Sequence, residues 1–169
     1  MNEGKRMGKW PVGLTLRDRL VLFGATAGFL GRIPLAPGTW GSLPAIPFAL
    51  GAHALSPTGE ALAVVLLCLS AVYLAGRAER LFGREDASPI VADEVAGMAV
   101  ALAFTDPTLF VVLRAFVLFR LLDITKPFGI GWVEKRLSGG IGVAADDILA
   151  GLGANLLGRF WDTVTQNAW

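Results

Sequence analysis

Five carboxylates stand at the ends of long apolar runs in this 169-residue chain. Ionised groups are costly to desolvate in such places, so an acid found there is a candidate functional residue. Two of them form a pair that opens one run, one closes a second run, and two form a pair near the start of a third. In chain order they are Asp93, Glu94, Asp123, Asp146 and Asp147. Any fold of this chain has to keep these groups solvated, paired or bound to a cation.

The apolar runs themselves predict a membrane protein. Hydrophobic residues make up 54% of the chain and charged residues only 17%, whereas an ordinary soluble domain has about 25% charged residues. No run shows sustained alternation of apolar and polar residues, so each is predicted to be a helix. The sequence therefore predicts an all-α fold, a compact multi-helix membrane bundle. Its hydrophobic helices, about five by this pattern, are expected near residues 43–55, 61–76, 94–104, 109–122 and 141–161.

The length and even composition predict one domain rather than two. Residues 1–19 read as a basic N-terminal segment, residues 20–161 as a single helical domain, and residues 162–169 as a C-terminal tail. The short apolar stretch Leu20–Leu30 is expected to be an interfacial or re-entrant helix. Several runs are shorter than the roughly 20 residues of a full span, so a soluble bundle with an unusually dry core stays open as the alternative.

Basic residues alternate with uncharged loops along the chain. Lys and Arg occur in residues 1–19, 77–92 and 123–140, whereas residues 56–60 and 105–108 contain none. In a multi-span membrane protein, the segments rich in Lys and Arg face the cytoplasm. The sequence therefore predicts that the carboxylates gather at the cytoplasmic face of a membrane.

A cluster of carboxylates without histidine or cysteine is typical of a site for a hard cation such as Mg²⁺. Arg120 and Lys126 would supply positive charge for a phosphate. Arg120 and Asp123 are three residues apart and so neighbours on a helix surface. Pro127 disfavours helical geometry at Lys126, which predicts that the lysine lies at a helix end. The alternative is that each acid only caps a helix N-terminus, where the helix dipole favours negative charge.

The stretch from Gly31 to Pro44 contains three prolines and three glycines, which predicts that no regular helix crosses it. Within it, Thr39 and Ser42 offer hydroxyl groups and backbone amides just before the next apolar run. Free N–H groups at a helix start bind anions, so this loop is a candidate phosphate-binding loop. A plain turn with Ser42 as a helix cap is the alternative.

The scarcity of histidine and cysteine excludes some mechanisms of phosphate hydrolysis. The only histidine is His53 and the only cysteine is Cys68, which excludes a phosphohistidine route with a second histidine as the acid. Cys68 lies in an apolar run, not in a phosphate-binding turn with a following arginine. What remains is metal-activated water attacking phosphorus.

Four stretches resemble the phosphatidylglycerophosphatase A family. They are IPLAPGTWGSLPAIPF (33–48), SPIVADEVAGM (88–98), FRLLDITKPFGIGWVE (119–134) and GGIGVAADDILAG (139–151). The resemblance implies an all-helical, multi-pass protein of the bacterial inner membrane. It also implies a Mg²⁺-dependent enzyme that removes phosphate from phosphatidylglycerophosphate, with membrane lipid and not nucleic acid as its partner.

The resemblance implies that the five acids form the active site; the roles that follow are expectations drawn from it together with the residue chemistry above. The expected catalytic residues are Asp93, Glu94, Asp123, Lys126, Asp146 and Asp147. The expected Mg²⁺ ligands are Glu94, Asp123, Asp146 and Asp147. The expected phosphate-binding residues are Thr39, Ser42, Arg120 and Lys126. Two other functions stay open at this point: a soluble or peripheral helical phosphatase of another phosphomonoester, and a small cation- or proton-coupled membrane transporter.

Overall fold

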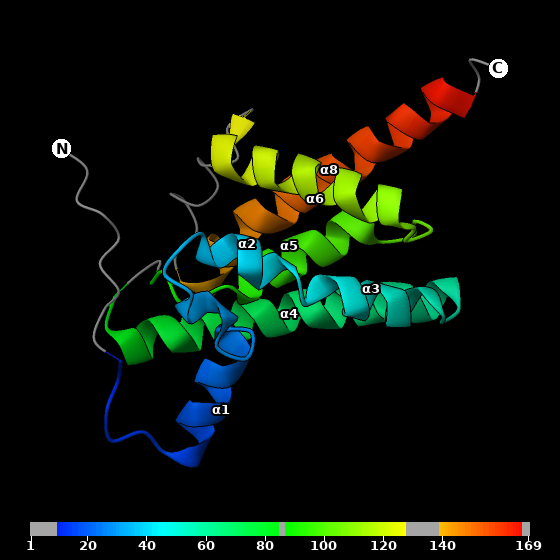
Figure 1. Ribbon diagram of the computed structural model, residues 1–169. Coiled ribbons are helices and arrows are strands. Elements are labelled where there is room, and N and C mark those ends of the chain that lie inside the picture. The colour runs from blue at the N-terminus through cyan, green and yellow to red at the C-terminus, as the bar shows by residue number, and fades with distance from the viewer. Residues whose placement is uncertain (1–9, 85–86, 128–138, 167–169) are drawn as a thin grey trace.

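The computed structural model describes residues 10–84, 87–127 and 139–166, and every regular element among these residues is a helix. The prediction of an all-α fold is therefore confirmed. Figure 1 shows the longer helices packed lengthwise against one another, with α1 set across one end. The elements are α1 (Leu16–Ala25), the 3₁₀ helix η1 (Leu30–Arg32), α2 (Pro37–Ser42), α3 (Ala45–His53), α4 (Pro57–Phe82), α5 (Ala92–Leu102), α6 (Leu109–Thr125) and α8 (Gly140–Gln166).

Local sequence signals fix where several of these helices begin and end. Thr15 caps α1 in a capping box with Asp18, and Ser56 caps α4 by accepting a hydrogen bond from the backbone N–H of Gly59. Thr108 caps α6 in the same way as Ser56 caps α4. At the other end of α4, Gly83 adopts the left-handed conformation (φ 66°) that commonly terminates a helix.

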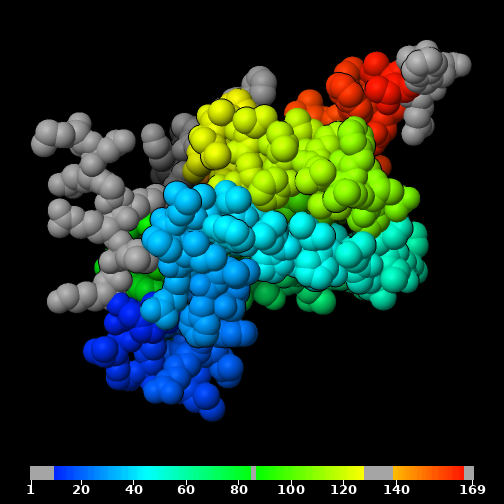
Figure 2. All heavy atoms as spheres, in the orientation of Figure 1, coloured from blue at the N-terminus to red at the C-terminus, as the bar shows by residue number. Residues whose placement is uncertain are grey.

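Helix α5 is the centre of the bundle and packs against α2, α3, α4, α6 and α8. In the space-filling view the α2–α3 segment and α6 cover it, so that little of α5 is visible (Figure 2). Its closest neighbour is α8, and glycines allow the approach. A Cβ atom added to Gly151 would lie 2.1 Å from the carbonyl oxygen of Gly97, and one added to Gly97 would lie 2.5 Å from that of Asp147. Only residues without a side chain fit at this crossing.

Polar side chains close the end of α5 that lies away from its acids. The Asn155 side-chain amide donates to the carbonyl oxygens of Ala101 and Ala103, at 3.0 and 2.8 Å. The Arg159 guanidinium donates to the carbonyl oxygen of Phe104 at 2.8 Å. Glu60, which is 6% exposed, accepts a hydrogen bond of 2.6 Å from the backbone N–H of Phe104. These contacts satisfy backbone groups that a helix end would otherwise leave without partners.

Among the described residues, two helices, α4 and α8, are long and apolar enough to cross a membrane. The prediction of about five hydrophobic spanning helices is not confirmed, because the other predicted spans are shorter. Helix α3 has 9 residues, α5 has 11 and α6 has 17, and a full span needs about 20 residues.

Two predicted boundaries in the N-terminal part are wrong. The apolar stretch Leu20–Leu30 is not one helix, because α1 starts at Leu16 and ends at Ala25. The stretch between Gly31 and Pro44 does contain a short helix, α2. Pro37 is its first residue, where a helix needs no N–H donor and the fixed φ of proline suits helical geometry.

Candidate active site

A cavity of about 310 Å³ lies where the start of α5 meets α2, the end of α6 and the start of α8. The structure brings all five carboxylates and both basic residues singled out in the sequence to the wall of this cavity. Its charged lining consists of Asp93, Glu94, Arg120, Asp123, Lys126, Asp146 and Asp147. Four segments that are far apart in the sequence therefore meet in one polar site.

The start of α5 positions two of the acids. Asp93 and Glu94 lie in its first turn, where the helix dipole favours negative charge. A carboxylate oxygen of Asp93 accepts a hydrogen bond of 3.1 Å from the backbone N–H of Glu94. The segment before the helix is held by a hydrogen bond of 2.8 Å from the Val91 N–H to the Ala25 carbonyl oxygen. The acids therefore stand on an anchored helix start and not on an open loop.

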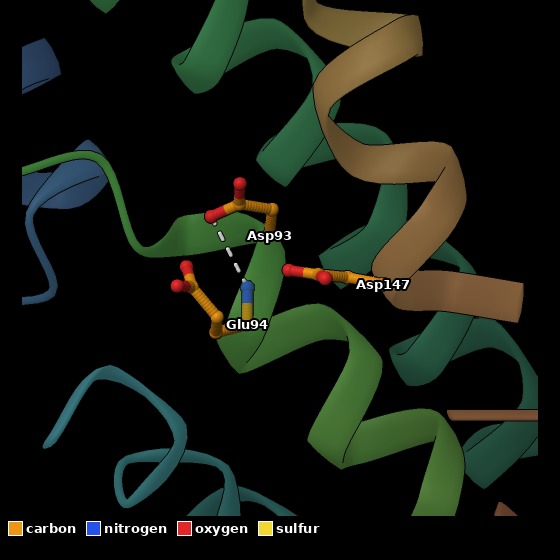
Figure 3. A group of neighbouring side chains, drawn as sticks. All are labelled: Asp93, Glu94 and Asp147. Carbon is orange, nitrogen blue, oxygen red and sulfur yellow. Dashed lines mark hydrogen bonds between the residues drawn. The ribbon is translucent and has the colours of Figure 1, made fainter. Parts of the chain in front are cut away.

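Asp147 reaches this helix start from the facing helix α8 (Figure 3). One carboxylate oxygen each of Asp93, Glu94 and Asp147 lie within 4.8 Å of one another. Oε2 of Glu94 is buried and has no hydrogen-bond partner. An oxygen-only donor set of this size, in which one residue has an unsatisfied buried oxygen, fits a hard divalent cation such as Mg²⁺.

Burial makes it costly for these acids to ionise together. Burial, together with the neighbouring Glu94 carboxylate, raises the pKa of Asp93 well above its usual range. The pKa of Glu94 rises to about 7, chiefly because of burial, with the charges of Asp147 and Asp123 acting in the same direction. A bound cation would remove this cost by favouring the ionised form of each ligand.

The two basic residues of the cavity are each paired with an acid. Arg120 donates a hydrogen bond of 2.6 Å to Asp123, which confirms that these two residues are neighbours on the surface of α6. Lys126 forms an ion pair with Asp146. Lys126 caps the C-terminal end of α6, as the following proline predicts, and its backbone is left-handed (φ 43°). Asp123 and Asp146, both expected as Mg²⁺ ligands, are thus paired with basic side chains. Asp93, which was not expected as a ligand, belongs to the three-residue group with Glu94 and Asp147.

Neither hydroxyl residue of the predicted phosphate-binding loop lines the cavity. Ser42 is fully buried, and its hydroxyl donates a hydrogen bond of 2.7 Å to the carbonyl oxygen of Gly38, one turn earlier in α2. The stretch reaches the cavity through Ala36, Pro37 and Gly38 instead. A Cβ atom on Gly38 would lie 2.4 Å from a carboxylate oxygen of Glu94 and 3.0 Å from the Arg120 guanidinium.

Sequence reasoning missed Ser88 and the role of Gly38. The Ser88 side chain lines the cavity, and its hydroxyl oxygen is buried without a hydrogen-bond partner. Ser88 belongs to the stretch SPIVADE just before the acidic pair, and that proximity was the available signal. Gly38 carried no signal of its own, because the need for a missing side chain there arises only when α2 packs over Glu94.

The fold and the cavity together define an all-α protein in which a group of buried carboxylates lines a cavity beside two basic side chains. The chain belongs to the phosphatidylglycerophosphatase A family, whose model matches residues 23–161. It is 39% identical over 123 residues to phosphatidylglycerophosphatase A of Escherichia coli (strain K12), which covers 72% of each chain. The corresponding protein of Haemophilus influenzae is 38% identical over 126 residues, covering 72% of this chain and 76% of the relative.

A third relative has a different name. A Bacteroides thetaiotaomicron protein, whose name proposes phosphatidylinositol-3-phosphatase activity, is 40% identical over 141 residues, covering 78% of this chain and 86% of the relative. No solved structure matches the chain. The family is thus fixed by sequence, and the relatives differ in the lipid phosphate that their names specify.

Proposed function

We propose that this protein hydrolyses the terminal phosphate monoester of phosphatidylglycerophosphate to phosphatidylglycerol and inorganic phosphate. Membership in the phosphatidylglycerophosphatase A family supports this activity. The single structural observation that carries the proposal is the cavity in which Asp93, Glu94 and Asp147 face Arg120 and Lys126. It combines a place for a cation with positive charge for a phosphate.

The acidic and the basic residues of the cavity would have different roles in the reaction. Asp93, Glu94 and Asp147 would hold Mg²⁺, with Asp123 and Asp146 close by. Bound Mg²⁺ neutralises charge on a phosphate and favours ionisation of a water molecule. Arg120 and Lys126 would bind the phosphate oxygens by charge-assisted hydrogen bonds, in exchange for part of their contacts with Asp123 and Asp146.

The reaction itself needs one water molecule. Its oxygen forms a bond to phosphorus, the bond between phosphorus and the glycerol oxygen breaks, and a carboxylate of the cavity accepts the proton of the water. Arg120 and Lys126 hold the phosphate in line for this displacement, since correct placement supplies much of the rate in phosphoryl transfer. The glycerol oxygen leaves as the hydroxyl group of the lipid product, and takes up the proton that the carboxylate accepted from the water.

We place the cavity at the cytoplasmic face of the inner membrane, with α4 and α8 as spanning helices. Supporting this, the last turns of α4 carry Arg77 and Arg80, while the 105–108 loop at the opposite end of the bundle has no Lys or Arg (Figure 1). A phosphate headgroup at that face would reach the cavity while its acyl chains stay in the bilayer.

The activity is tested with purified full-length protein in detergent micelles, by release of inorganic phosphate from phosphatidylglycerophosphate in Mg²⁺ or in EDTA. Wild type should turn over only with Mg²⁺, and Asp147→Asn should lose at least a hundredfold in kcat because a carboxylate of the cation site is gone. Asp106→Asn, an equal change in an exposed loop at the far end, should keep wild-type turnover.

Phosphatidylinositol 3-phosphate is the comparison substrate, because of the name of the Bacteroides relative. Preferred turnover of that lipid would replace the proposed substrate while keeping the reaction. Turnover that survives EDTA, or near-normal turnover by Asp147→Asn, would remove the proposed mechanism.

Cation binding is tested separately by thermal unfolding without substrate. Because the cation would bind the folded cluster only, Mg²⁺ at a hundred times its Kd should stabilise the protein by about 2.7 kcal/mol. Asp93→Asn should lose most of this shift, since one of its oxygens belongs to the three-residue group. An equal shift in wild type and Asp93→Asn would place the Mg²⁺ effect elsewhere.

A further inference from the structure

A second cavity, of about 410 Å³, lies away from the carboxylates, between residues 10–14, α1 and η1. Apolar and aromatic side chains form most of its wall, and two arginines complete it. The residues that matter here are Trp10, Leu14, Arg19, Leu22, Phe29 and Arg32. We call this the arginine–tryptophan cavity.

Neither of its two arginines has a carboxylate partner within the part of the chain that the structure describes. Among residues 10–84, 87–127 and 139–166, no acid forms an ion pair with Arg19 or Arg32. Other arginines do have such partners: Arg114 pairs with Asp162, and Arg120 with Asp123. Two unneutralised guanidinium groups on one cavity wall create a local excess of positive charge, which favours an anion.

Aromatic rings hold one of these guanidinium groups in place. The central carbon of the Arg32 guanidinium lies 4.7 Å from the centre of the Trp10 ring and 6.0 Å from that of Phe29. The Trp10 ring in turn packs edge-on against Phe82 of α4, at 5.5 Å between ring centres. A guanidinium stacked on an aromatic face keeps its N–H donors at its edge, in the fork that matches two phosphate oxygens.

The surface around this cavity is apolar and basic at once. Val12, Leu16 and Leu20 are 94%, 75% and 63% exposed, and the exposed Arg17 and Arg19 stand between them on α1. Exposed large apolar side chains interleaved with arginines are typical of a segment that lies in the headgroup region of an anionic membrane.

We propose that the arginine–tryptophan cavity binds the phosphate of an anionic phospholipid headgroup. Arg19 and Arg32 take the phosphate oxygens, and the apolar wall formed by Leu14 and Leu22 lies beside the glycerol and upper acyl chain. The bound lipid fixes α1 and the segment before it to the membrane surface. This site needs none of the residues of the carboxylate cavity, so it stands apart from the proposed phosphatase activity.

The test measures lipid binding to purified full-length protein in detergent. The probes are dioleoyl phosphatidylserine, dioleoyl phosphatidylcholine and inorganic phosphate, and the readouts are the shift in Tm and the lipid retained in native mass spectra. Phosphatidylserine is neither the proposed substrate nor its product. Wild type should retain phosphatidylserine at least tenfold more tightly than phosphatidylcholine, and inorganic phosphate should give little shift.

Variants locate the binding. The R19Q/R32Q double variant should lose at least tenfold in phosphatidylserine affinity, whereas R80Q, the same type of charge loss at an exposed position on α4, should bind like wild type. If the double variant does not fold, R32K is the test variant. It keeps the positive charge but not the stacked guanidinium, and its phosphatidylserine affinity should still fall severalfold.

Four results would overturn the proposal. An equal loss in R80Q would show that net charge alone is responsible. Unchanged binding by R32K or R19Q/R32Q would remove the site. Binding lost in Asp147→Asn but kept in R19Q/R32Q would place the lipid in the carboxylate cavity. A shift by inorganic phosphate as large as that by the lipid would make the ligand a soluble phosphate.

Discussion

Gly38, which has no side chain, allows α2 to pack closely over the carboxylate cavity. Gly38 lies under the carboxylate of Glu94 and the guanidinium of Arg120, with no space for a methyl group. A glycine here is therefore needed for the distance between two helices, and not for an unusual backbone angle.

We therefore expect Gly38→Ala to impair activity more than stability. The new methyl group would meet the ends of two side chains, which can move, so the fold should lose only about 1 kcal/mol. Glu94 and Arg120 would be displaced by several tenths of an ångström, and misplacement on that scale reduces kcat by roughly tenfold or more. The measurement is phosphate release together with Tm.

Gly51→Ala is the control for this variant, because nothing lies within 4 Å of a Cβ atom at Gly51. It should leave both quantities unchanged or raise Tm slightly, since alanine favours a helix. A Gly38→Ala protein with wild-type kcat would show that the cavity tolerates a methyl group between α2 and the side chains of Glu94 and Arg120.

At the scale of the helices, the α5–α8 crossing brings the acids of one helix to those of the other. The backbones touch at Gly97 and Gly151, and in each helix the acids lie about one turn before the glycine. A larger separation of the two axes would move Asp147 away from Asp93 and Glu94 by the same amount. The crossing is thus part of the site as well as of the core.

Gly151→Ala should therefore destabilise the protein and weaken the site together. Its methyl group would meet a backbone carbonyl 2.1 Å away, which cannot rotate aside, so a cost of about 1–3 kcal/mol is expected. Thermal unfolding measures the first effect, and the Mg²⁺ concentration for half-maximal activity, which should rise, measures the second. Loss of stability with an unchanged Mg²⁺ requirement would separate the crossing from the site.

Local signals in the sequence predicted the helices and several of their ends. Pro127 correctly predicted that α6 ends near Lys126, and the three-residue spacing predicted the contact between Arg120 and Asp123. These features depend on neighbours within one turn. The short helix α2 was missed because prolines and glycines were treated only as interruptions, although Pro37 suits the first position of a helix.

Contacts between distant residues could not be predicted in the same way. Glu60 binds the backbone of Phe104, 44 residues away, and Asn155 binds Ala103, 52 residues away. No pattern in the sequence marks such partners. The division of the acids into a three-residue group and two ion pairs has the same origin, because it depends on how α8 is turned against α5 and α6.

At the scale of the whole molecule, one end of the bundle holds the carboxylate cavity and the other holds loops without Lys or Arg. Figure 1 shows the α3–α4 and α5–α6 connections together at the end opposite the start of α8. If α4 and α8 span the membrane, these two ends face different compartments.

Labelling of single cysteines tests this orientation, in a Cys68→Ser background. A membrane-impermeant maleimide added to spheroplasts should label Asp106→Cys at the loop end, but should label Arg80→Cys at the cavity end only after permeabilisation. The reverse labelling pattern would show that the cavity faces the outer side of the membrane. Labelling of both sites without permeabilisation would exclude a spanning arrangement.

The polar closure of α5 has a consequence for how the chain is assembled during synthesis. Helix α5 is too short to cross a bilayer alone, with 11 residues or about 16 Å. Asn155 donates to the carbonyl oxygen of Ala101 in its last turn, and Arg159 donates to that of Phe104 just beyond its end. Both residues belong to α8, the last helix of the described chain to leave the ribosome. Until α8 arrives, α5 lacks those donors and the cavity lacks Asp146 and Asp147. A chain that stops before α8 therefore lacks two of the five carboxylates, and the cavity is complete only after α8 has been synthesised.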